Sequence, residues 1–399
     1  MVAYLDHAAS TPVRPEAAKA FTDALAHAGN PSSVHRHGQA ARALVEDARE
    51  HLATVLGCQP IEVIFTSGGT ESINLALVGL FRAAVEKDAK RNRIVVPEAE
   101  HHATLDTVLW LQEHEGAVLE WIPVDKLGRI DVTELGDTLE RAGKSVALVT
   151  MLWANNEVGT IQPVAEIAAL AAEHHVPLHI DAVSAFGHIP INFAQIRTDS
   201  GAHGNAGLVA LSISGHKFGS VPGVGALVVS REAQLEPLIR GGGQQRGLRS
   251  GTLDAPAISS MAIAALVTDK AFENEHARLV SLRDATIAKI QELVPDAVLS
   301  GDPQNRLDNN VNFTFPGCQS DSLLFLLDAM GVSVSTGSAC QAGVAQPSHV
   351  LLAMGHDERG ASSALRISLG HTTAQEELDE FFAALPEAVE RARKAGTTV

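Results

Sequence analysis

Apolar segments alternate with helical segments between residues 61 and 182, and this pattern constrains the fold more than any other feature of the sequence. The apolar segments are nearly continuous, which is typical of parallel strands that are covered on both faces. The expected strands are 61–66, 93–98, 118–124, 145–151 and 176–182. The expected helices between them are 72–87, 103–114, 132–142 and 163–174. The alternation predicts an α/β fold with a large, doubly wound, mostly parallel sheet.

Two later apolar runs, 208–213 and 226–229, follow each other without a helix between them. This predicts that one strand turns back antiparallel. Residues 193–208 are rich in Gly, Ser, Asp and Asn, and we expect a mobile surface loop there. A second glycine-rich segment, 241–252, contains arginines in an otherwise acidic protein and suits an anion.

The chain of 399 residues, 45% of them hydrophobic, is long enough for one large core and a second, smaller domain. We expect a large domain over residues 13–255 that begins with helices near 14–28 and 39–56. Residues 1–12 and 256–399 should form a small α/β domain that carries the Cys340 loop. Its expected elements are a long helix at 256–293, strands at 309–315, 332–336 and 364–370, and helices at 321–331, 348–355 and 375–395.

Composition excludes several classes of function. The formal net charge of −17 repels nucleic acid and anionic membranes, so neither is an expected partner. No apolar stretch reaches the span of a bilayer, and the N-terminus lacks the features of a signal peptide, which together predict a cytoplasmic protein. Three cysteines without CxxC spacing argue against a disulfide framework, and the 18 histidines include no HExxH, so we expect no structural metal.

Lys217 lies in the turn between the runs 208–213 and 226–229. Buried lysines are rare unless they are paired, and two explanations remain open for this one. Its stem can lie along the rim of the sheet with the amine in water. Alternatively, the amine forms a Schiff base with a carbonyl cofactor such as pyridoxal phosphate (PLP). The second explanation requires an acid for the pyridine nitrogen, a phosphate site and a flat group against the ring.

Gly69 and Thr70 are candidates for the phosphate site, because they follow the strand 61–66 and open the next helix. Backbone amides, the helix dipole and a hydroxyl together bind an anion, although an ordinary N-cap would look the same in sequence. The chain has neither a Walker A motif nor GxGxxG, which disfavours a nucleotide.

Three polar residues follow strands whose carboxyl ends meet at one edge of a parallel sheet. Asp181 can face the pyridinium nitrogen or cap the next segment. His101 can stack on a flat ring and move protons, or bond the local backbone. Asn156 can bond the phenolic oxygen of the cofactor or shape its own turn.

Cys340 and Arg366 are the candidates in the second domain. Cys340 lies among small residues, which suggest an accessible loop where a thiolate acts as a nucleophile; the alternative is a buried apolar cysteine. We expect Cys58 and Cys318 to be buried, apolar cysteines. Arg366, inside an apolar strand, is costly to bury unless it meets an anion such as a carboxylate.

These residues lie in motifs that resemble the cysteine desulfurases of the NifS/IscS type, in the class V aminotransferase family. The resemblance runs from about residue 4 to the last helix and implies the PLP-dependent transferase fold type I, as in aspartate aminotransferase. The motifs are YLDHAASTP, GNPSSVH, FTSGGTES, EHHA, ANNEVGTIQP, HIDA, SGHKFG, GGGQQRGLRSGT, STGSAC and PSHVLLAMG.

The resemblance implies a role for each candidate. Lys217 is the Schiff-base lysine, His101 stacks on the ring and moves protons, and Asp181 pairs with the pyridinium nitrogen. Cys340 takes sulfur from L-cysteine as a persulfide, leaving L-alanine, and passes it to acceptors such as an iron-sulfur scaffold protein; it is also a possible transient cluster ligand. The other implied cofactor contacts are Asn156 and Ser184 near the phenolic oxygen, and Gly69, Thr70, Ser214, His216 and the partner subunit's Thr252 at the phosphate. The implied contacts of the substrate carboxylate are Asn30 and Arg366.

Three departures from the family pattern bear on these roles. Ser184 stands where a glutamine is usual, and its shorter side chain puts the contact with the phenolic oxygen in doubt. The segment 197–206 is longer than expected. Gln245 stands where a glutamate is common, which would weaken a charge contact near the subunit boundary.

Alternatives with the same fold are a selenocysteine lyase or cysteine sulfinate desulfinase and, more distantly, an aminotransferase that releases a keto acid. A sulfur-carrier scaffold that binds PLP without catalysis is an alternative of another class. Formation of sulfide and alanine from cysteine separates the desulfurase from the scaffold.

Overall fold

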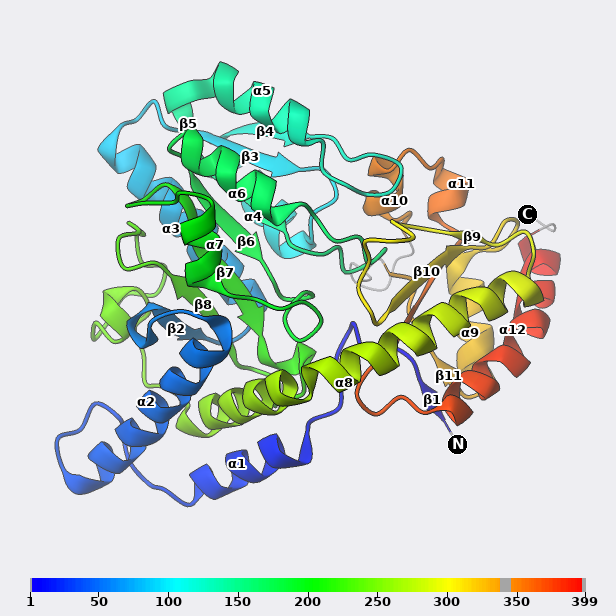
Figure 1. Ribbon diagram of the computed structural model, residues 1–399, viewed down its shortest axis with the longest axis horizontal. Coiled ribbons are helices and arrows are strands. Elements are labelled where there is room, and N and C mark those ends of the chain that lie inside the picture. The colour runs from blue at the N-terminus through cyan, green and yellow to red at the C-terminus, as the bar shows by residue number, and fades with distance from the viewer. Residues whose placement is uncertain (1, 338–345, 397–399) are drawn as a thin grey trace.

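A seven-stranded sheet forms the centre of the larger part of the molecule in the computed structural model, which describes residues 2–337 and 346–396 (Figure 1). Its strand order is β2-β8-β7-β6-β5-β3-β4. The strands are β2 (Val63–Thr66), β3 (Arg93–Pro97), β4 (Val118–Ile122), β5 (Val146–Leu152), β6 (Pro177–Asp181), β7 (Gly207–Ser214) and β8 (Gly225–Val229). Strands β4, β3, β5, β6 and β7 run parallel, whereas β8 is antiparallel to both β7 and β2. The predicted parallel sheet with a reversed strand is confirmed.

Helices cover both faces of this sheet. Apolar side chains of α3 (Gly69–Lys87) and α4 (His102–Glu115) pack on one face. Those of α2 (Arg36–Leu56), α5 (Val132–Ala142), α6 (Val164–Glu173) and the first half of α8 (Ala255–Leu293) pack on the other. Helix α1 (Pro15–Leu25) lies against α8. The predicted helices are all present, and their bounds differ from the prediction by a few residues at most.

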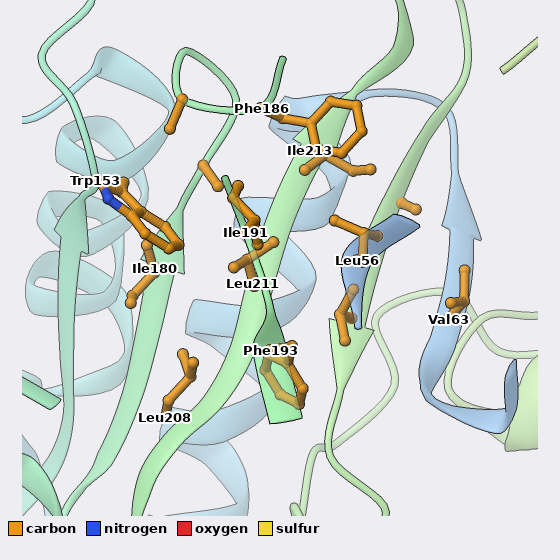
Figure 2. Packing of buried hydrophobic residues seen from close by; sticks show 14 of the residues in the cluster. Leu56, Val63, Trp153, Ile180, Phe186, Ile191, Phe193, Leu208, Leu211 and Ile213 are labelled. Carbon is orange, nitrogen blue, oxygen red and sulfur yellow. The ribbon is translucent and has the colours of Figure 1, made fainter. Parts of the chain in front are cut away.

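The predicted loop at 193–208 is wrong in its first half, where the chain forms α7 (Phe193–Asp199). Asn192 begins this helix, because its side-chain oxygen accepts a hydrogen bond from the backbone N–H of Gln195 at 2.9 Å. Phe193 is fully buried in the main hydrophobic cluster. Figure 2 shows its ring in the cluster that also contains Leu208 and Leu211. The burial of Phe193 and the cap at Asn192 therefore stabilise a helix in a segment whose composition favours a loop.

The smaller part contains a three-stranded sheet with the order β12-β10-β9 and a separate pair, β1 with β11. The strands are β1 (Ala3–Tyr4), β9 (Val298–Leu299), β10 (Asn310–Thr314), β11 (Val332–Ser333) and β12 (Ala364–Ser368). The helices are α9 (Ser320–Ala329), α10 (His349–Ala353), α11 (Glu358–Ala361) and α12 (Gln375–Gly396). The sequence did not predict β9 or α11, both of which are very short.

The N-terminal segment belongs to the smaller part by packing, since Ala3 and Leu5 share a hydrophobic cluster with β10, β12 and α12. Helix α8 runs without a break from the larger part to the smaller one (Figure 1). The predicted domain boundary at residue 255 stays a prediction, and it coincides with the first residue of this helix. No helix among the described residues is long and apolar enough to cross a bilayer.

Candidate active site

A cavity of about 380 Å³ lies where β5, β6 and β7 end and the N-terminus of α3 begins. Parallel strands present their carboxyl ends at one edge, and α/β folds bind ligands at that edge. Ten of the predicted site residues line this cavity. They are Gly69, Thr70, His101, Asn156, Asp181, Ser184, Ser214, His216, Lys217 and Arg366.

Lys217 lies in a single turn of 3-10 helix (Gly215–Lys217) directly after β7. Its Nζ donates hydrogen bonds to the backbone oxygens of Ala8 at 2.6 Å and Ala9 at 3.1 Å. Burial, and then the charge of Arg366, lower the pKa of Lys217 to about 8, while the charge of Asp181 acts in the opposite direction. With this pKa about a tenth of the amine is neutral at pH 7, and the neutral form is a nucleophile for a carbonyl. The sequence did not predict the carbonyls of Ala8 and Ala9 as its partners.

Asp181 ends β6 and is almost completely buried. Burial raises its pKa to about 6, against the opposing effects of a hydrogen bond from the Val183 N–H at 2.9 Å and the charge of Lys217. A buried carboxylate without an ion-pair partner in direct contact is costly. A cationic ring nitrogen in the cavity would supply such a partner.

His101 is the N-cap of α4, and its Nδ1 accepts a hydrogen bond from the backbone N–H of Ala103 at 3.0 Å. This fixes the tautomer, because Nδ1 is the acceptor and the ring proton is therefore on Nε2. Burial, and then the charge of Lys217, lower the pKa of His101 to about 4. The imidazole is neutral at pH 7 and is oriented by the helix that it caps.

Glu100, next to His101, was not predicted from the sequence. It is fully buried, its Oε1 accepts a hydrogen bond from the Leu152 N–H at 2.8 Å, and its Oε2 has no partner among the described residues. Burial, with a smaller contribution from the charge of Asp181, raises the pKa of Glu100 well above its usual value. Two buried carboxyl groups therefore lie near each other, Asp181 in the cavity wall and Glu100 outside it.

The start of α3 borders the cavity, and its role as a phosphate site stays a prediction. A Cβ at Gly69 would lie 2.8 Å from Cγ2 of Val183, so a side chain there would force Val183 to shift. The first-turn amides of α3 and the side chains of Thr70, Ser214 and His216 all border the cavity. Burial, followed by the charge of Lys217, lowers the pKa of His216 to about 4.

Two arginines of the glycine-rich segment 241–252 have partners within the chain, and the predicted anion site there stays a prediction. Arg249 pairs with Glu71 in the first turn of α3 at 2.8 Å. Although burial alone would raise the pKa of Glu71, hydrogen bonds from Arg249 and Ser67 lower it. Arg246 donates to the backbone oxygen of Val229 at 3.1 Å.

Gln245 has a contact that a glutamate could not make in full. Its Nε2 donates to the backbone oxygen of Phe65 at 2.6 Å, and its Oε1 accepts from the Phe65 N–H at 2.8 Å. The side chain thus pairs with the outer edge of β2 as a short strand would. The expected weakening of a charge contact at a subunit boundary stays a prediction.

Arg366 enters the cavity from β12 and is 4% exposed. It donates to the backbone oxygen of Asn156 at 2.9 Å and to Oδ1 of Asp6 at 3.0 Å. Its Nε is buried and has no partner among the described residues. A guanidinium that lines the cavity and is held in place by two acceptors suits a ligand carboxylate.

Two predicted residues are described by the structure and do not line this cavity, and a third, Cys340, cannot be placed relative to it. Asn30 lies on an exposed loop, where its Oδ1 accepts from the Ser32 N–H at 2.9 Å. Thr252 is also exposed and is absent from the cavity wall. Cys340 lies outside the described residues. The roles of all three stay predictions.

Burial raises the pKa of the Cys58 thiol to about 12 and raises that of the Cys318 thiol as well. Neither thiol is therefore a ready nucleophile. No group of three His, Cys, Asp or Glu side chains among residues 2–337 and 346–396 is arranged to hold a metal ion.

The residues that line the cavity fit PLP. A lysine with a lowered pKa can bind its aldehyde, the buried Asp181 can pair with its ring nitrogen, and the start of α3 can hold its phosphate. The volume of about 380 Å³ falls in the usual range for small-molecule sites.

Residues 3–381 match the family described as "Aminotransferase class-V". The chain belongs to this family. Among curated members, an "IscS-like cysteine desulfurase" of Mycobacterium tuberculosis is 49% identical over 99% of this chain and 98% of that protein. A "Cysteine desulfurase IscS" of Dictyoglomus turgidum is 38% identical over 98% of this chain and 95% of that protein.

Solved structures of similar fold agree with this family assignment. A "NifS-like protein" superposes with a TM-score of 0.87 at 31% identity, covering 98% of this chain and all of that one. A NifS-like protein from Rickettsia africae gives a TM-score of 0.85 at 30% identity, with the same coverage. The predicted family and the fold type I architecture are therefore confirmed.

Proposed function

We propose that this protein is a PLP-dependent cysteine desulfurase, which converts L-cysteine to L-alanine and carries the sulfur as a persulfide on Cys340. The observation that carries the proposal is the convergence of Lys217, Asp181, His101 and Arg366 on one cavity. The relatives named cysteine desulfurase, which match over nearly the full length, support the choice of substrate.

In this proposal PLP, when bound, supplies a ring that withdraws electrons from the substrate's α-carbon. Lys217 would hold the cofactor through its aldehyde. Asp181 would pair as an anion with the ring nitrogen, and Gly69, Thr70, Ser214 and His216 would hold the phosphate. The partner subunit's Thr252 completes the phosphate site.

Arg366, which lines the cavity, binds the substrate carboxylate, and Asn30 is the second proposed contact. His101 has a neutral ring with Nε2 as its free nitrogen, so this atom can carry protons between substrate positions. The Cys340 thiolate attacks the substrate sulfur, forming the S–S bond as the C–S bond breaks. The electron pair of that bond stays on carbon, which takes up a proton and becomes the methyl group of alanine.

Purified protein reconstituted with PLP, then given L-cysteine and dithiothreitol, should release sulfide and alanine in equal amounts. Cys340→Ala should bind PLP and cysteine yet form no persulfide, and Lys217→Ala should lose both products. A well-folded yellow protein that forms neither product would contradict the proposal and favour a scaffold role. A keto acid in place of alanine would indicate an aminotransferase.

The proposal includes a homodimer, an acceptor protein and a cytoplasmic location. An open pocket of about 460 Å³, lined by Asn74, His102 and the 43% exposed Trp110, flanks the PLP site and supports coverage by a second subunit. The acceptors would be proteins that assemble iron-sulfur clusters or other sulfur-containing cofactors. A persulfide chemistry that depends on a reduced thiol suits the cytoplasm.

A further inference from the structure

A short turn near the N-terminus, residues 6–10, forms part of the wall of the main cavity, because Ala8 and Ala9 line it. The backbone oxygens of these two residues accept hydrogen bonds from Nζ of Lys217, at 2.6 Å for Ala8 and 3.1 Å for Ala9. Lys217 follows β7 of the larger part, whereas the turn follows β1 of the smaller part. Hydrogen bonds to the charged form of a group stabilise that form, so the two carbonyls favour the ammonium of Lys217.

Two side-chain hydroxyls hold this turn in place. The hydroxyl of Tyr4 donates to the backbone oxygen of Ser10 at 2.7 Å and lies 3.2 Å from that of Asp6, so it joins the two ends of the turn. On the other side, Oγ of Ser368 in β12 accepts a hydrogen bond from the Ala8 N–H at 2.8 Å, and Ser368 is fully buried. Neither hydroxyl-bearing residue is among the described residues that line the cavity, so each can act on the amine only through the turn.

The charged and titratable groups that face the amine of Lys217 come from several segments. They are Asp6 of the turn, His101 at the start of α4, Asp181 at the end of β6, the adjacent His216 and Arg366 of β12. Burial lowers the pKa of Lys217 most, Arg366 acts in the same direction, and the two carboxylates act in the opposite direction. A change that displaces the two carbonyls and removes no charge should therefore shift Lys217 toward its neutral form.

We propose that Tyr4 and Ser368 are positioning residues for Lys217, because they hold the turn at residues 6–10 where its carbonyls bind the free amine. An amine that is fixed at one place in the cavity wall is in position to meet a carbonyl compound that enters the cavity. The role of the turn in the reaction rests on the proposed function, in which the same amine holds PLP. The contacts of the turn do not depend on that function.

The pH at which Lys217 becomes reactive tests the proposal directly. Cofactor-free protein is treated with a trace of acetic anhydride over a series of pH values, and mass spectrometry of the peptide that contains Lys217 gives the pH of half-maximal labelling. Only the neutral amine reacts, so this midpoint follows the loss of the ammonium. Tyr4→Phe and Ser368→Ala each remove one hydroxyl and no charge, and each should lower the midpoint by about 0.5–1 pH unit. An unchanged midpoint would overturn the assignment of that residue.

Thr160→Val is the matched control for Ser368→Ala. Thr160 is also fully buried, and its Oγ1 accepts a hydrogen bond from a backbone N–H, that of Asp302 at 3.0 Å. It is not among the described residues that line the cavity. The control should lower the melting temperature and leave the midpoint of Lys217 labelling unchanged. If it shifted the midpoint as far as Ser368→Ala does, a general loosening of the fold would be the cause and the proposal would fail.

Binding of PLP tests the role of the turn in the proposed function. The rate at which cofactor-free protein binds PLP, followed by absorbance, should depend on pH with the same midpoint as the labelling. This midpoint should fall in Tyr4→Phe and stay unchanged in Thr160→Val. A protein whose labelling shifts as expected but which binds no PLP would refute the proposed function and leave the role of the turn intact. Normal PLP binding with unshifted labelling would refute the role of the turn alone.

Discussion

Replacing Arg366 by lysine should weaken binding of cysteine far more than it weakens the fold. Arginine satisfies the Asn156 carbonyl through Nη1 and Asp6 through Nη2, and each of these nitrogens has a second N–H for a ligand. A lysine ammonium keeps the charge but cannot reach all three acceptors from one point. Either the contact with the substrate or the contacts that fix the side chain will be lost.

The expected magnitude follows from the lost bond. A hydrogen bond between a guanidinium and a carboxylate contributes about 1.5–3 kcal/mol in a buried site. The corresponding increase in KM for L-cysteine is roughly 10- to 150-fold. Cysteamine lacks the carboxylate, so its binding should change little, and the preference for cysteine over cysteamine should fall by a similar factor.

The assay is alanine formation at varied cysteine concentration, combined with a spectroscopic titration of PLP-loaded protein with each amine. Arg306→Lys is the matched control, because Arg306 is also 4% exposed with an unpartnered Nε but does not line the cavity. The control should lower the melting temperature and leave KM unchanged. If Arg366→Lys raised KM for cysteine no more than the control did, the assignment of Arg366 to the carboxylate would be refuted.

Three further predictions concern pH and local packing. Because Asp181 has a pKa of about 6 and pairs with a cationic ring as an anion, PLP affinity should fall as the pH drops below 6, and fluorescence titration should show no such fall in Asp181→Asn. Gly69→Ala places a methyl 2.8 Å from Cγ2 of Val183. The variant should still fold but bind PLP roughly tenfold more weakly, and an unchanged PLP affinity would contradict the close packing. Gln245→Glu removes the donor to the Phe65 carbonyl and should cost about 1–2 kcal/mol of stability by urea unfolding, whereas a stability equal to that of the wild type would show that the contact contributes little.

The larger part of the fold was predictable because its strands are continuous apolar runs that alternate with helical segments. This alternation is typical of a parallel sheet that is covered by helices on both faces. The helix at 193–199 was not, since its stability depends on the burial of Phe193 in a core assembled from distant segments. Composition describes the segment alone and does not include that burial. The short strand β9 depends in the same way on pairing with β10.

The site was predictable where residues follow strands of one sheet, as Asp181 and His101 do. It was not predictable where the smaller part contributes, because no local pattern shows that the carbonyls of Ala8 and Ala9 bind Lys217 or that Asp6 binds Arg366. Glu100 was overlooked for a different reason. His101 accounted for the EHHA motif, and nothing in the sequence shows that the neighbouring carboxyl group is buried.

The uninterrupted α8 limits how the molecule can move. With 39 residues it is about 58 Å long, and it packs in the core of the larger part at one end and of the smaller part at the other. A swing of one part against the other would have to flex this helix along its length, since it offers no loop to act as a pivot. Substrate entry and release should therefore rely on short surface segments around the cavity, and the distance between the two parts should be nearly the same with and without cysteine.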